Sequence, residues 1–156
     1  MKKRDDYDLM CERSEDYSLD LENINKLYSA TIRRGLLDSY DVIIADALDC
    51  LFEFGKVNNF IEEIANLCKD EQSYFVKGRV ILCSAFSDNP KFLQKLRNME
   101  FNEADEYNSI WLNVARYLKD KDDTYLMAVR MSATSSDQTK ASLSQSLLAS
   151  IDEGKM

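Results

Sequence analysis

Carboxylates are the most frequent reactive side chains in this sequence, and one group of them lies between residues 38 and 63, in a segment with a helical apolar pattern. That stretch carries seven acids against a single base, Lys56. Because a helix turns by about 100° per residue, several of these acids share one helical face, opposite the apolar residues of the segment. The members of this face are Asp38, Asp46, Asp49 and Glu53. The sequence therefore predicts a carboxylate surface directed away from the core.

Like charges one helical turn apart repel each other, and no Lys or Arg lies three or four residues from Asp46 or Asp49. Two more acids follow on the next segment, and a tyrosine beside the face could act as an anchor. Three interpretations stay open: a solvated surface, a surface for a basic protein partner, and a divalent-cation site. We favour the partner, and expect no metal because helix faces rarely converge enough oxygen ligands. The expected contact residues are Asp38, Tyr40, Asp46, Asp49, Glu53, Glu62 and Glu63.

Catalytic motifs are scarce in this sequence. Histidine is absent, which removes the Ser–His and Cys–His nucleophiles and the commonest general base. The sequence also has no Walker loop, no GxGxxG motif and no nucleophile elbow. We therefore expect neither an enzyme nor a cofactor. A hydrolase with two carboxylates is the alternative, although these acids fall on expected solvent faces, where burial does not raise a pKa.

The four cysteines are widely separated, which argues against a zinc site or a disulfide framework. Cys50, Cys68 and Cys83 lie in apolar surroundings and are expected to be small core residues with reduced thiols.

Net charge and hydropathy restrict the partners and the location of the protein. The formal net charge is −8, which disfavours direct binding to nucleic acid, because Lys and Arg must replace counterions on phosphates. No apolar run approaches the roughly 20 residues of a membrane span. Lys2, Lys3 and Arg4 are followed by acids instead of the apolar core of a signal peptide. We expect a cytoplasmic protein that binds no membrane.

The elements that would position these side chains are helices. Low proline and glycine contents, one and four residues, favour helices joined by short turns. Apolar periodicity predicts a helix that starts at an N-cap Ser18 and a helix that opens at Pro90 after the cap residues Asp88 and Asn89. A narrow apolar stripe near the C-terminus suits a short capping helix or a partly frayed tail; its members are Leu143, Leu147, Leu148 and Ile151. The periodicity predicts the other helices over 40–54, 57–68, 73–86, 104–118 and 124–131.

These helices repeat. Tyr40, Tyr74 and Tyr107 are spaced by 34 and 33 residues, and in this register Ile44, Gly78 and Trp111 also align. Other matched sets are Ala47, Ile81 and Val114, and Leu48, Leu82 and Ala115. Three helix pairs at a near-constant period are typical of a stacked α-solenoid.

We therefore predict an all-α fold of stacked antiparallel helix pairs, a short HEAT-like α-solenoid, with an irregular helical bundle as the alternative. The expected divisions are a poorly ordered acidic segment over 1–17, a helical repeat domain over 18–131, and a polar loop with a short capping helix over 132–156.

The stretch from Leu19–Tyr28 through Asp41–Gly55 to Leu118 resembles the HEAT-like immunity proteins of bacterial contact-dependent growth inhibition and related polymorphic toxin systems. The resemblance implies a cytoplasmic inhibitor that binds one cognate secreted toxin domain, often a nuclease. A nuclease presents Lys and Arg to phosphates, so that an acidic inhibitor suits its groove. The alternative function is a helical adaptor or scaffold that binds a protein or peptide.

Overall fold

The computed structural model describes residues 17–69, 72–99 and 106–156, and within these ranges all regular structure is helical. This confirms the all-α prediction. The helices are α2 (Tyr17–Leu36), α3 (Asp41–Phe54), the 3-10 helix η1 (Val57–Phe60), α4 (Ile61–Ala65), α5 (Tyr74–Cys83), α6 (Pro90–Asn98), α7 (Glu106–Asp120), α8 (Asp123–Ser132) and α9 (Gln138–Asp152).

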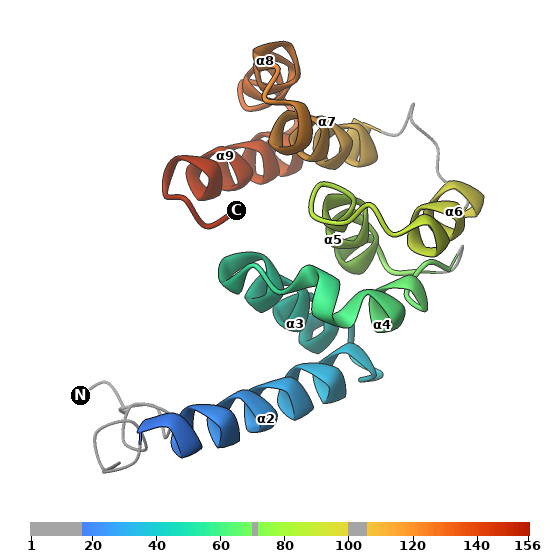
Figure 1. The fold of residues 1–156 in the computed structure, drawn as a ribbon. Helices are drawn as coiled ribbons and strands as arrows, with labels where there is room; N and C mark the ends of the chain where they lie inside the picture. Colours follow the sequence, from blue (N-terminus) through green and yellow to red (C-terminus); the bar gives the residue numbers. More distant parts are fainter. Residues whose placement is uncertain (1–16, 70–71, 100–105) are drawn as a thin grey trace.

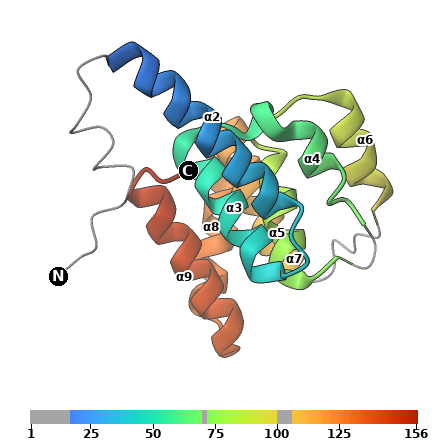
Figure 2. The same ribbon diagram turned by 90° about the horizontal axis from the view of Figure 1, so that it is seen from below.

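Three of the helices form the spine of the molecule. α3 packs between α2 and α5, and α5 packs between α3 and α7, so that the chain rises in layers from α2 to α7 (Figure 1). α4 and α6 pack against each other on one side of this spine, and α9 lies on the other side (Figure 2). α8 then packs on α7 and α9, at the opposite end of the molecule from α2. The layers agree with the predicted stacking of helix pairs.

Apart from the tyrosine set, in which Tyr40 and Tyr74 are exposed, the aligned positions of the repeat face the core. Leu48, Leu82 and Ala115, one aligned set, are all buried, and so are Ile44, Gly78 and Trp111. The periodicity of the sequence therefore identified the packed side of α3, α5 and α7, where burial of apolar surface contributes about 25 cal/mol per Å².

Polar side chains begin several helices at the expected places. Asn89 accepts a hydrogen bond from the backbone N–H of Phe92, with Pro90 in the first turn of α6, as predicted. Ser73 accepts from the N–H of Val76 at the start of α5. These acceptors satisfy backbone donors that have no partner inside the helix.

The first and the last helix of the described chain begin earlier than predicted. α2 begins at Tyr17, so that Ser18 lies inside the helix and is not its N-cap. The expected poorly ordered segment over 1–17 falls, apart from Tyr17, outside the described residues. At the other end the polar loop is only a few residues long, because Asp137 accepts from the N–H groups of Thr139 and Lys140 and starts a 15-residue helix, α9.

Two central helices are shorter than predicted. The helix expected over 57–68 divides into a 3-10 turn and a short α-helix that ends at Ala65. The helix expected over 73–86 ends at Cys83, and Tyr74 and Phe75 in its first turn are exposed.

Candidate partner-binding site

The acidic surface is positioned by the apolar stripe of α3. Ile44, Leu48 and Leu51 recur at helical spacing and are buried, which turns the other side of the helix toward solvent. The helix ends at Gly55, whose φ of 64° is in the left-handed region, where glycine has no Cβ penalty. The direction of the carboxylates therefore follows from how α3 packs.

Two of the predicted acids form the free part of this surface. Asp46 and Glu53 are exposed on α3, and neither forms an ion pair with any residue that the structure describes. Val42, one turn before Asp46, is 66% exposed on the same side of the helix. The solvent side of α3 therefore combines uncompensated negative charge with an exposed apolar side chain.

The prediction that these carboxylates lack balancing cations was wrong for Asp49. Arg79 of α5 donates from Nε to Asp49 Oδ1 at 2.8 Å and from Nη2 to Asp49 Oδ2 at 3.1 Å. The two residues are 30 positions apart, so that no rule for neighbours within one helix could have found the pair. Asp49 acts first as an anchor between α3 and α5.

Asp38 does not lie on the helical face where it was predicted. It precedes α3 and its Oδ1 accepts a hydrogen bond from the backbone N–H of Tyr40 at 2.9 Å. Asp38 therefore shapes the turn between α2 and α3, as short polar side chains commonly do before a helix. Tyr40 occupies the N-cap position of α3, and its side chain is 70% exposed.

The two predicted acids of α4 have different environments. Glu62 is exposed. Glu63 accepts from Arg33 Nε of α2 at 2.7 Å, and this hydrogen bond lowers the pKa of the Glu63 carboxyl, with desolvation acting against it. Glu63 therefore connects α4 to α2, and its charge is balanced within the protein. Of the seven predicted contact residues, Tyr40, Asp46, Glu53 and Glu62 are exposed without an ion pair in the described chain.

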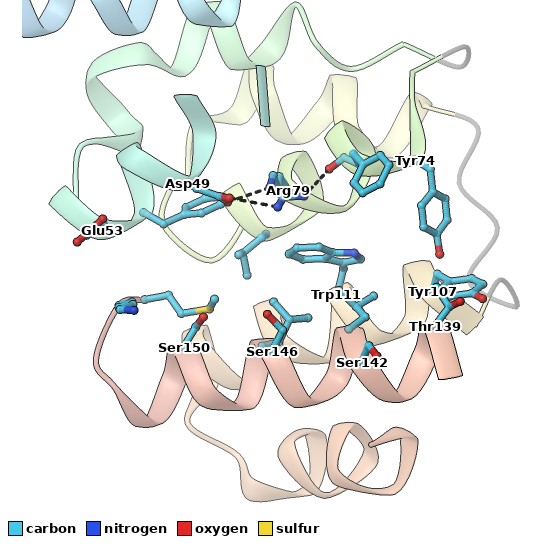
Figure 3. Close-up of a pocket in the computed structure, with 17 residues that line it drawn as sticks. Asp49, Glu53, Tyr74, Arg79, Tyr107, Trp111, Thr139, Ser142, Ser146 and Ser150 are labelled. Carbon is cyan, nitrogen blue, oxygen red and sulfur yellow. Dashed lines mark hydrogen bonds and ion pairs between the residues drawn. The ribbon is translucent and has the colours of Figure 1, made fainter. Parts of the chain in front are cut away.

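A groove of about 540 Å³ adjoins the acidic face, between α3, α5, α7, α9 and the last two residues of the chain (Figure 3). Asp49 and Glu53 line it from α3. Tyr74, Phe75 and Arg79 line it from α5; Tyr107 and Trp111 from α7; Ser142, Leu143, Ser146 and Ser150 from α9. The structure thus joins part of the predicted acidic surface to an aromatic groove that the sequence did not indicate.

The floor of this groove is rigidly built. Trp111 is almost fully buried, and the Arg79 guanidinium lies 5.5 Å from the centre of its ring, within the range of a cation–π interaction. Tyr74 and Tyr107, which align in the repeat, meet edge to face with ring centres 5.0 Å apart. The repeat therefore places these two equivalent tyrosines, one on α5 and one on α7, in contact.

Carboxyl groups with displaced pKa values give no support to acid catalysis. The pKa is lowered for Glu63, and it is lowered for Asp122, where the backbone N–H of Thr124 donates to the carboxylate. A catalytic general acid needs the opposite shift. Within the described residues no group of three or more Cys, Asp and Glu side chains is placed to hold a metal ion.

The described cysteines are free thiols, and burial changes how they ionise. Desolvation raises the pKa of Cys68 from 9.0 to about 11, although Lys95 lowers it, and desolvation also raises the pKa of the fully buried Cys83. Cys83 is a buried core residue, as predicted, whereas Cys50 and Cys68 are only partly buried and pack against the core.

These pKa shifts predict a loss of stability at alkaline pH. Below pH 9 the thiols are protonated in both the folded and unfolded chain, whereas between pH 9 and about 11 the unfolded chain ionises Cys68 and the folded chain does not. The free energy of unfolding should therefore fall over this range. The slope should be less than about 1.4 kcal/mol per pH unit, which is the limit when one proton is bound in the folded state and absent in the unfolded state. Urea unfolding at several pH values, compared between the natural chain and Cys68→Ala, measures it. An identical pH dependence in the two proteins would contradict the assignment to Cys68.

Of the helices in the described ranges, none is both long enough and apolar enough to cross a membrane. Comparison of the chain with known protein families, with curated proteins and with solved structures finds no match.

Proposed function

We propose that this chain is an immunity protein, which binds a cognate secreted toxin domain of basic charge and neutralises it. The observation that carries the proposal is the solvent side of α3, where Asp46 and Glu53 have no ion-pair partner among the described residues and share the face with the exposed Val42. The two acids lie two helical turns apart on the same side of α3, so that their charges add to one negative surface. Such a surface attracts a cationic partner from a distance.

Exposed apolar residues near these acids support a protein as the partner. Leu37, Tyr40 and Val42, around the start of α3, are each about two-thirds exposed. Protein interfaces combine apolar anchors at their centre with charged groups at the rim. The three exposed apolar side chains do not contribute to solubility, whereas a complex with a protein partner would bury them.

The function is tested by survival of cells that produce the toxin. The chain should protect cells against the C-terminal domain of a large secreted protein encoded immediately upstream of it. It should bind that domain with nanomolar affinity or tighter, which corresponds to a binding free energy of about −12 kcal/mol or lower. Absence of both protection and binding would reject the immunity function.

The role of the acidic face is tested by a double substitution, Asp46→Asn with Glu53→Gln. Both positions are exposed, so that the isosteric amides should leave the fold intact. We expect the association rate with the toxin at low salt to fall about tenfold and to depend less on salt. Asp120→Asn with Asp123→Asn, exposed acids at the junction of α7 and α8, removes the same charge elsewhere. Equal effects of the two double variants would reject the α3 face.

A peptide-binding adaptor is the second candidate, and the groove beside α3 is the observation that favours it, since adaptors commonly hold a segment between stacked helices. The relative affinity separates the two functions: an adaptor should bind a short isolated peptide about as tightly as the whole partner, whereas an immunity protein should bind the folded toxin far more tightly than any isolated peptide.

A further inference from the structure

The groove between α3, α5, α7 and α9 has its cations already neutralised. Arg79 uses Nε and Nη2 on Asp49 and donates from Nη1 to the carbonyl of Phe75 at 3.0 Å. Lys155 lies 2.6 Å from Glu153, and the pKa of Lys155 is raised chiefly by Glu153 and only weakly by Glu53. Asp49 and Glu53 line the groove together with Arg79 and Lys155, whereas Glu153, which pairs with Lys155, lies outside the lining. Because both cations are paired, the lining carboxylate without an ion pair among the described residues is Glu53, on the α3 side.

The opposite wall of the groove offers apolar surface. Phe75, in the first turn of α5, is 64% exposed, and the neighbouring Tyr74 is 43% exposed. On the α9 side, the small side chains of Ser142 and Ser146 are exposed and leave the groove open (Figure 3). An incoming apolar side chain could cover Phe75 and be held between α5 and α9, which is the desolvated setting in which anchors contribute most.

We propose that this groove receives a cationic segment of the partner protein, whose apolar anchor packs on Phe75 and whose Lys or Arg lies opposite Glu53. The occupant follows from charge complementarity: the free carboxylate is at the mouth, and Arg79 would repel a cation deeper in the groove were it not held by Asp49. The inference rests on the proposed function and adds to it residues of α5, α7 and α9 as the contact surface.

Trp111 makes the groove observable, because it is the single tryptophan of the chain and lines the groove. The probe is a 14-residue amphipathic peptide of Leu and Lys, with a counterpart that has Glu in place of Lys. We expect the Lys peptide to bind, by fluorescence anisotropy of a labelled copy, and to shift the emission of Trp111. The Glu peptide should bind about tenfold more weakly or not at all. Failure of the Lys peptide to bind, or equal binding of both peptides, would overturn the proposal.

A matched pair of variants locates the binding. Phe75→Ser should weaken binding of the Lys peptide about fivefold or more, whereas Met131→Ser, which removes a similarly exposed apolar side chain of α8 outside the groove, should not change it. Both sites are solvent-exposed, and circular dichroism checks that both variants fold. If the peptide binds without changing the emission of Trp111, or if Phe75→Ser does not weaken its binding, the groove is rejected as the binding site. The proposal for the acidic face of α3 is not affected by that result. If the peptide binds in the groove but the chain does not protect cells against the toxin, the immunity function is rejected and the groove is retained as a binding site for a cationic segment.

Discussion

Replacement of Phe92 by alanine is expected to lower the free energy of unfolding by about 3–5 kcal/mol, the usual cost of removing a buried aromatic ring. Phe92 is fully buried in the main hydrophobic cluster and is the one buried side chain of α6. The other apolar residues of α6, Leu93 and Leu96, are only partly buried. Phe92 therefore supplies most of the attachment of α6 to the rest of the protein, and a cavity left in its place has no neighbour on α6 to fill it.

The measurement is urea unfolding followed by circular dichroism, with hydrogen exchange to find where protection is lost. Leu93→Ala is the control, because it shortens a half-buried side chain of the same helix and should cost distinctly less. Since small domains are stable by only about 5–15 kcal/mol, Phe92→Ala should also speed exchange in α6 and in α4, which packs against it. A loss below about 1 kcal/mol would mean that α6 is held by other contacts.

The helices and their packed faces were predictable because each depends on short-range pattern. The apolar stripe of α3, the Asn89 cap and the 33–34-residue repeat all follow from residues close together in sequence or from their recurrence. The start of α9 was placed too late, because the polar stretch before it was expected to be a longer loop. The feature that begins the helix is the Asp137 cap, and Leu147 is buried in it.

The charge balance of the site was not predictable from one helix at a time. Polar contacts between layers join residues 28–31 positions apart: Arg33 to Glu63, Asn58 to the carbonyl of Phe86, Arg79 to Asp49, Lys95 to Asn66, Lys119 to Asp88 and Tyr107 to Asp137. This separation is about one repeat less one helical turn. A search for oppositely charged residues at that distance would have found the partners of Asp49 and Glu63 in the sequence alone.

The groove was missed because its walls come from four helices that are distant in sequence. Phe75 and Trp111 both fit an apolar periodicity, and nothing in that pattern separates an exposed aromatic side chain from a buried one. The groove exists because α9 packs beside the spine and supplies the wall that faces α5 and α7 (Figure 2). The acidic α3 face could be proposed from the sequence, but the surface that continues it needed coordinates.

Gly78→Ala should lower the free energy of unfolding by about 3 kcal/mol, although alanine is the better helix former by about 1 kcal/mol. A Cβ on Gly78 would overlap the pyrrole edge of the Trp111 ring. That ring is nearly buried and lies against Arg79, so that it cannot turn aside without disturbing the floor of the groove, and overpacking of this kind commonly costs about 1–3 kcal/mol or more. The aligned glycine and tryptophan therefore set how closely α5 and α7 approach.

A double-mutant cycle separates this overlap from a general effect on α5. Trp111→Leu removes the indole edge, and Gly78→Ala in that background should cost at least about 1 kcal/mol less than in the natural chain, since contacting residues are energetically coupled. Gly35→Ala is the helical control: its Cβ would lie 3.0 Å from the Cβ of Ala47, a far smaller overlap, and its cost should stay below about 1 kcal/mol. Helix propensity alone predicts that Gly78→Ala stabilises the protein. If that were observed, α5 and α7 could not be packed as closely as the contact with Trp111 requires, and Trp111 could not form the floor of the groove.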